Sequence, residues 1–313
     1  MAIARSILKD GLLWLIVMLL FLSLLFLPRS AAYSEGQGGM YTGAKYDYSF
    51  EAHMDEFKEF VQYIKENKGL GTVYNGHSLN ENVLRTFMKS MLITIPALLL
   101  GFFLGVAKGV FDYRVRNRKG RLAGVTVTRF FLSVPDLFLI IFMQLLIMEL
   151  YEKGIIPHIS VYGSDEVSVV ILAIIFLMIY PLFYIANITF FSIRDEQGMD
   201  YIRTALSKGT SSFKILYSHV LKNCFVKILS HANTITIYTL SNLFIVEFLT
   251  NYRGAAIFFY ETMTAPQEFF VGQQFSFHVY PAAGYIILFT GVIYISKILS
   301  QIARGMVSPL ERN

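Results

Sequence analysis

A polar segment between two long apolar runs carries the residue types best suited to binding a partner protein. It extends from Asp195 to Asn223 and reads DEQGMDYIRTALSKGTSSFKILYSHVLKN. Apolar residues recur at helical spacing on both sides of Gly209, which predicts two short helices around a glycine turn. The two apolar stripes are Met199, Ile202, Ala205 and Leu206, then Phe213, Leu216, Val220 and Leu221. Ser211 or Ser212 can cap the second helix. This pattern favours a docking surface over a reaction centre.

Motifs for enzymatic chemistry do not occur in the sequence. There is no GxxxxGK[ST] phosphate-binding loop, which argues against ATP hydrolysis by this chain. There is no HExxH or GxSxG, and the six histidines lack metal-ligand spacing. The single cysteine, Cys224, excludes an internal disulfide and a Cys-rich metal site. We therefore expect a non-catalytic chain without catalytic residues, metal ligands or a cofactor of its own.

The composition indicates a polytopic membrane protein. Of the 313 residues, 55% are apolar and only 16% are charged, and the mean hydropathy is +0.52. The net charge of +5 could suggest nucleic acid. The basic residues, however, cluster in short loops beside apolar runs, as membrane topology requires. We therefore expect a lipid bilayer, and no nucleic acid, among the partners.

Six apolar runs are long enough to cross a bilayer as helices. They are Gly11 to Leu27, Phe87 to Val110, Phe130 to Leu150, Val167 to Phe191, Phe225 to Phe248 and Val279 to Ser296. Basic loops after the second and fourth runs, and a basic tail, place both termini in the cytoplasm. The predicted fold class is an all-α membrane protein with six transmembrane helices in one domain, residues 1–313. A cleavable signal peptide is the less favoured alternative for the first run, because small residues follow at Ser30-Ala31-Ala32.

Two of these runs carry features that predict helix packing. Gly101 and Gly105 lie four residues apart in the second run, so another helix can approach closely there. In the third run Pro135 predicts a kink. Arg129 and Asp136 are seven residues apart and could form an ion pair on one helix face. Asp136 is the only carboxylate that we expect clearly below the membrane surface.

The fifth run differs from the others because polar side chains are spread along it. Lipid would penalise these groups, so the helix belongs inside a bundle or beside a water-filled path. We favour the path over pure packing. Its candidate lining residues are Asn233, Thr234, Thr236 and Glu247. His231 is the one histidine expected within a span, with a role in hydrogen-bonded packing.

Residues 29–85 form the predicted extracellular insert between the first two spans. Within it Met54, Phe57, Val61 and Ile64 share one face of a predicted helix. Two interpretations are compatible with this pattern. The insert can pack on the helix ends, or it can serve as a landing surface for an extracellular partner.

A polytopic chain without energy-coupling chemistry is a passive channel, an ion-coupled carrier, or a subunit driven by a separate motor. Carriers usually need intramembrane acids or broken-helix ion sites, and Asp136 offers little of either. The segment from Asp195 to Asn223 favours an external motor. A scaffold or sensor that binds an ATPase without transporting is a further alternative, and the polar fifth run argues against it.

The polar segment also resembles a known motif. The matching residues are Asp200-Tyr201-Ile202-Arg203-Thr204-Ala205, Lys208-Gly209, Ile215 and His219-Val220-Leu221-Lys222-Asn223. They resemble the cytoplasmic loop of permease subunits in ABC importers of the dipeptide, oligopeptide and nickel family. The resemblance implies a type I importer permease fold, in which residues 195–223 are the cytoplasmic coupling loop. It further implies ATPase-coupling roles for Asp200, Tyr201, Arg203, Thr204, Ala205, Lys208, Gly209, His219 and Asn223.

The same resemblance implies a set of partners and a cargo. The partners are a second, related permease subunit, two ATP-binding subunits that hold ATP and Mg, and an extracellular substrate-binding protein. Peptides are the favoured cargo, and nickel or another metal chelate is the alternative. The location implied is the bacterial cytoplasmic membrane. Packing of the segment on the chain's own basic loop is the competing, purely structural interpretation.

Overall fold

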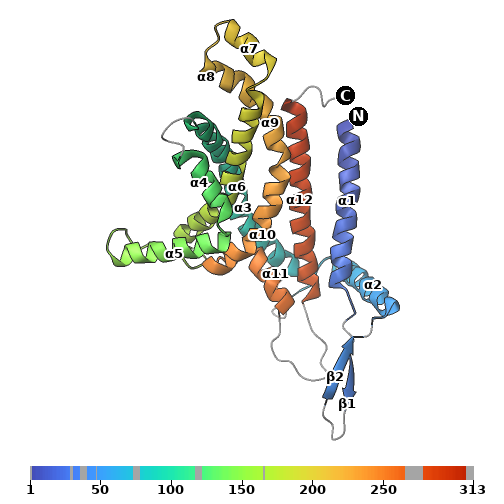
Figure 1. Ribbon diagram of the computed structural model, residues 1–313. Coiled ribbons are helices and arrows are strands. Elements are labelled where there is room, and N and C mark those ends of the chain that lie inside the picture. Colours follow the sequence, from blue (N-terminus) through green and yellow to red (C-terminus); the bar gives the residue numbers. More distant parts are fainter. Residues whose placement is uncertain are drawn as a thin grey trace. The chain divides into compact units, whose positions relative to one another are not determined.

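The computed structural model describes residues 2–28, 31–35, 41–46, 48–72, 78–116, 122–164, 166–264 and 278–307. These residues are helical apart from one β-hairpin and the connecting loops (Figure 1). They group into two compact units. The larger unit contains Met1–Asp10, Ser90–Arg253 and Val292–Asn313, and the smaller unit contains residues 11–89 and 254–291. The prediction of a single domain stays a prediction.

The predicted spans correspond to five straight helices and one bent pair within the described residues. The helices are α1 (Ala2–Leu25), α3 (Leu79–Val115), α6 (Val167–Glu196), α10 (Ala232–Thr250) and α12 (Val279–Val307), each containing a candidate membrane span. The bent pair is α4 (Val127–Ser133) with α5 (Asp136–Glu152). With that pair counted as one span, the prediction of an all-α protein with six spans is confirmed.

The third span bends at Pro135, as the sequence predicted, and the bend is larger than we expected. The chain turns by 102° between α4 and α5. Val134 and Pro135 are both extended, with ψ of 130° and 136°. Proline lacks the N–H of a helical hydrogen bond and pushes the preceding residue out of the helical region, so both effects act at one point. Arg129 and Asp136 no longer share a helix, and the predicted ion pair between them is not formed. Asp136 instead accepts a 2.5 Å hydrogen bond from the Tyr238 hydroxyl.

The other spans also differ from their predicted boundaries, and three of them are described here. The second begins at Leu79, eight residues earlier than the predicted Phe87. The sixth was predicted to be short, but its apolar helix from Val279 to Met306 has 28 residues. The fifth is divided at His231 into α9 (Leu221–Ser230) and α10. The His231 ring lies 3.1 Å from the Tyr184 hydroxyl, which confirms its hydrogen-bonded role.

In the larger unit α3 packs directly on α6 along a row of three glycines. A Cβ atom built on Gly105 would lie 2.7 Å from the Leu182 carbonyl oxygen, and one on Gly109 only 2.5 Å from that of Ala186. A Cβ atom on Gly101 would lie 2.8 Å from the Pro181 Cβ atom. No side chain fits at these positions, so the two backbones are in contact. The predicted close packing at Gly101 and Gly105 is confirmed, and it continues for one further turn.

The smaller unit is built around aromatic residues of α2 (Phe50–Asn67). Phe60 is only 7% exposed, and its ring centroid lies 4.4 Å from that of Phe26. Two of the four residues predicted to form the apolar face of this helix pack on the core. Phe57 and Ile64 pack on the same core, whereas Met54 and Val61 are 40% and 37% exposed. The helix is rotated so that Phe60, not Val61, faces inward.

The rest of the insert contains a hairpin of β1 (Ala31–Glu35) and β2 (Tyr41–Tyr46). The strands are antiparallel, with an irregularity between Ser34 and Glu35. A helix α11 (Ala255–Thr264) follows the fifth span. Parts of the predicted insert lie outside the described residues, as do three basic residues of the loop after α3: Arg118, Lys119 and Arg121.

Candidate functional site

The segment after α6 folds into short helices, as its apolar pattern predicted. It contains α7 (Asp200–Ser207), α8 (Ser212–Ile215) and a π-helical turn, η3 (Leu216–Val220), which leads into α9. Figure 1 shows α7 and α8 beyond the end of α6, at the top of the view. Gly209 makes the turn with φ of 76°, a backbone conformation that favours glycine. The cap is Ser211, whose hydroxyl accepts a hydrogen bond from the Lys214 backbone N–H.

The apolar residues of this segment divide between the core and the surface. Ile202 and Ala205 pack against a buried cluster that includes Ile215, Leu216 and Cys224. Three other apolar side chains are about half exposed: Met199 at 48%, Leu206 at 50% and Phe213 at 59%. Each predicted stripe is therefore only partly buried. Large apolar groups held outside the core in this way are typical of a binding surface.

A hollow of about 440 Å³ lies beside these exposed side chains. Its lining comes from the end of α3, the end of α6 and the short helices, and includes Tyr113, Arg114, Arg116, Gln197, Leu206 and Phe213. The Arg114 guanidinium carbon lies 5.3 Å from the Phe213 ring centroid, and that of Arg116 lies 3.8 Å from the Tyr113 ring. Cations at these distances attract the ring faces. The hollow therefore offers an apolar floor with a basic, aromatic rim.

Tyr201 joins the two halves of the predicted motif. Its hydroxyl donates a 2.6 Å hydrogen bond to the Glu196 carboxylate at the end of α6, and it also bonds to Asn223 in α9. The pKa of Tyr201 is raised to about 12, first by burial and then by the hydrogen bond to Glu196, while the bond to Asn223 opposes the rise. Tyr201 and Asn223, 22 positions apart in the sequence, are thus brought together in the fold, while their predicted coupling roles stay predictions.

The remaining predicted coupling residues lie on the surface. Asp200 and Arg203 are exposed, with 3.7 Å between a carboxylate oxygen and a guanidinium nitrogen. Thr204, Lys208 and His219 are exposed as well. An exposed ion pair contributes little to stability, about 0–1 kcal/mol. The fold therefore does not depend on these side chains, and their predicted coupling roles stay predictions.

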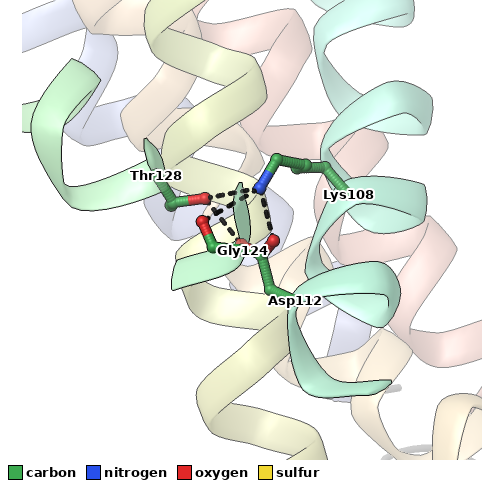
Figure 2. Close-up of polar contacts among 4 residues, drawn as sticks. All are labelled: Lys108, Asp112, Gly124 and Thr128. Atoms are coloured by element: carbon green, nitrogen blue, oxygen red, sulfur yellow. Dashed lines mark hydrogen bonds and ion pairs between the residues drawn. The ribbon is translucent and has the colours of Figure 1, made fainter. Parts of the chain in front are cut away.

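A buried polar cluster supports the site and was missed by the sequence analysis. Figure 2 shows Lys108, Asp112, Gly124 and Thr128, with the amine pointing toward the other three. Lys108 donates to the fully buried Asp112, to the Gly124 carbonyl at 3.3 Å and to the Thr128 hydroxyl at 3.2 Å. Thr128 donates to Asp112 at 2.6 Å. The cluster fastens the end of α3 to the π-helical turn η2 (Leu122–Thr126) and to α4.

Comparison with known proteins agrees with this architecture. The model of the family described as "binding-protein-dependent transport system inner membrane component" matches residues 82–306. The chain belongs to this family. It is therefore an importer permease, which confirms the resemblance seen in the polar segment. It is also a multi-pass membrane protein, as the apolar helices indicate.

Several known permeases are similar to this one. A dipeptide transport system permease protein of Bacillus subtilis is 24% identical over 264 residues, which cover 82% of this chain and 80% of the relative. A glutathione transport system permease protein of Salmonella choleraesuis is 22% identical over 201 residues, covering 64% and 63%. A putative peptide transport system permease protein of Brucella suis is 26% identical over 160 residues, covering 49% and 51%.

The four residues of the fifth span that were predicted to line a translocation path lie in different surroundings. Thr236 is buried, and its hydroxyl lies 2.8 Å from that of Ser296 on α12. Glu247 is fully buried and accepts a hydrogen bond from Ser90 on α3. Thr234 is exposed and Asn233 is partly buried. Their role in a translocation path stays a prediction.

Two acidic side chains, those of Asp112 and Glu247, are completely buried inside the larger unit. Each is held by a partner on the same or another helix, Lys108 for Asp112 and Ser90 for Glu247. Short-range sequence patterns do not show the partner of Glu247, because Ser90 is 157 positions away. The expectation that Asp136 is the only carboxylate clearly below the membrane surface stays a prediction, because burial within the protein does not give depth in a membrane.

Proposed function

We propose that this permease and a second, related permease subunit together form the translocation path of an ATP-driven importer for short peptides. An extracellular binding protein delivers the peptide, and two cytoplasmic ATP-binding subunits hold ATP and Mg. Three relatives support the peptide cargo, because their names assign them to dipeptide, glutathione and peptide transport. The polar α10 supports a path through the bundle, since its side chains are costly in lipid.

The observation that carries the coupling role is the surface around α7 and α8. Met199, Leu206 and Phe213 are held about half exposed, and the last two line a basic, aromatic hollow. An apolar surface on short helices suits a groove of a partner protein, which would remove it from water. We assign this partner as the ATP-binding subunit, because the sequence of this chain has no phosphate-binding loop of its own. Asp200, Arg203 and Lys208 set the polar register, while Ala205 and Gly209 allow close approach.

The packing of the segment supports a mechanical path from the ATP-binding subunit to the membrane. Ile202 and Ala205 on α7 share a buried cluster with Ile193 on α6. Tyr201 bonds to Glu196 at the end of the same helix. When the two ATP-binding subunits close on ATP, they move α7 and α8 as levers. The levers move α6, and the spans switch between inward-open and outward-open states.

Replacement of Gly209 tests the docking role directly. A Cβ atom at Gly209 meets nothing within 4 Å, so a larger side chain there would collide with a docked partner but not with this chain. Gly209→Ala and Gly209→Leu share the cost of a positive φ, about 1 kcal/mol, and differ in bulk. In the assembled complex we expect Leu to abolish peptide-stimulated ATPase activity and Ala to retain most of it.

Gly154→Leu is the matched control, because Gly154 also has a positive φ and open space beside it but lies after α5. Both leucine variants should insert normally into membranes. Equal ATPase stimulation in Gly209→Ala and Gly209→Leu would sink the docking model. For the carrier alternative, peptide uptake driven by a proton gradient in vesicles without ATP-binding subunits is the discriminating measurement.

A further inference from the structure

The smaller unit contains a second cavity, which the coupling role leaves without a function. Its volume is about 900 Å³, within the range of ligand pockets, about 300–1,000 Å³. The walls come from α2, the start of α3, α11 and the start of α12. The lining residues that the structure describes all belong to the smaller unit.

The walls of this cavity are firmly held by contacts within the unit. The rings of Tyr63 and Tyr280 stack with centroids 3.9 Å apart and planes 6° apart. Buried Thr86 and Tyr285 share a 2.8 Å hydrogen bond between their hydroxyls. A Cβ atom on Gly284 would lie 2.8 Å from a Leu70 methyl carbon, so α12 is closely packed there. A cavity held open in this way loses little free energy to ordering when a ligand binds.

Charged groups of both signs line the cavity from separate helices. Arg85 stands on α3, Glu56 on α2 and Glu261 on α11. One guanidinium nitrogen of Arg85 donates to the Asn82 side chain at 3.2 Å. A guanidinium carries five N–H donors in a planar fork that suits a carboxylate. The bond to Asn82 therefore orients the group and takes only one of its donors. Phe258 and Tyr280 add apolar surface.

We propose that this cavity binds a short peptide by its two ends. Arg85 binds the terminal carboxylate, Glu56 and Glu261 bind the terminal ammonium group, and the aromatic wall contacts the side chains. The proposal rests on the proposed function and deepens it, because it gives the permease its own peptide site apart from that of the binding protein. Among the described lining residues two carboxylates stand against one guanidinium, which favours a basic peptide over an acidic one.

Equilibrium binding of radiolabelled trialanine to the complete importer in nanodiscs, without the binding protein, tests this site. The Arg85→Gln variant should weaken trialanine binding about tenfold or more, as expected for a lost charge-assisted hydrogen bond. It should leave the binding of trialanine amide, which lacks the carboxylate, unchanged. The double variant Glu56→Gln with Glu261→Gln should weaken trialanine binding similarly, but not the binding of N-acetyltrialanine.

The controls are Lys65→Gln and Glu59→Gln, which change charges on α2 outside the cavity. Both should bind trialanine as the unaltered importer does. The proposal is overturned if the unaltered importer shows no saturable trialanine binding, or if Arg85→Gln weakens the amide equally. It is also overturned if Arg85→Gln lowers only uptake that requires the binding protein, since the cavity would then receive a segment of that protein.

These results are separable from the proposed function. Uptake and ATPase stimulation by trialanine with the binding protein, together with unaltered binding by the cavity variants, would overturn the cavity site and leave the importer role intact. The predicted binding pattern without any ATP-dependent uptake would support the cavity site and overturn the importer role.

Discussion

Aromatic and aliphatic residues serve opposite purposes in two amphipathic regions of this permease. On α2 in the smaller unit, Phe57 and Phe60 face a core that they share with Phe26. On the short helices α7 and α8, Leu206 and Phe213 are held away from the core. Hydrophobicity alone does not separate these cases. The difference teaches that the inward residues specify the fold, whereas the outward residues are available to a partner.

The two regions also differ in how they are attached. The α2 helix is held by ring contacts, such as the stack of Tyr63 on Tyr280. The short helices combine apolar packing of Ile202 and Ala205 with a polar bond from Tyr201 to Glu196. Apolar attachment depends on complementary shape, whereas polar attachment depends on charge and hydrogen bonding. Substitutions of the two kinds should therefore have different signatures.

Phe60→Ala should have the largest effect. The ring is buried and contacts Phe26, Phe57 and Tyr280, so truncation leaves a cavity and costs about 3–5 kcal/mol. Thermal unfolding of the purified complex, together with limited proteolysis in α2, measures the loss. The exposed Met54 supplies the control, because Met54→Ala should change stability by less than about 0.5 kcal/mol. Equal losses in the two variants would contradict the inward orientation of Phe60.

Lys108→Met should come next. It leaves the Asp112 carboxylate buried without its cationic partner, which costs about 3 kcal/mol at the lower end of the usual range, because Lys108 is partly exposed. The double variant Lys108→Met with Asp112→Asn removes both charges and should recover much of the lost stability. A double-mutant cycle on thermal unfolding measures the coupling. Additive losses would show that the two groups do not act as a pair.

Leu206→Ala should affect function while leaving the fold intact. Because half of this side chain is exposed, its truncation should cost less than about 0.5 kcal/mol of stability. If the side chain fills a groove of an ATP-binding subunit, peptide-stimulated ATPase activity should fall about tenfold or more at limiting concentrations of that subunit. The comparison between the two regions fails if unfolding shifts strongly and ATPase stimulation does not.

Tyr201→Phe should have the smallest effect, and that effect should depend on pH. The pKa of Tyr201 is raised from 10 to about 12 in the folded protein, mainly by burial. The stability that its neutral form contributes is fully present below about pH 10 and is lost as the pH rises toward 12. At neutral pH the variant should be about 1 kcal/mol less stable, because the bond to Glu196 is missing. This deficit should shrink above pH 10, and a deficit independent of pH would count against the assignment.

The short helices were predictable from sequence because their signals are local. Gly209 marks the turn, Ser211 supplies the cap, and helical spacing places Ile202 on the buried side. What spacing could not show is that Met199 and Leu206, in the same stripe, lie outside the core. The exposure of these side chains depends on how much of α7 the neighbouring helices cover, and only the packed structure shows that.

The bend in the third span and the buried polar cluster show two further limits. Pro135 indicated a kink but not its size. The 102° angle also requires Val134 to be extended, and the sequence alone does not give that angle. Lys108 and Asp112 have the i,i+4 spacing of a helical ion pair. Thr128 completes the cluster from another helix, so only the packed structure reveals it.

The glycine row between α3 and α6 has a mechanical consequence for transport. Gly101, Gly105 and Gly109 bring the two backbones into contact over successive turns, and no flexible side chain lies between them to yield under load. One helix cannot slide or roll on the other without atoms colliding. If the short helices displace α6 during transport, as we propose, α3 should therefore move together with it.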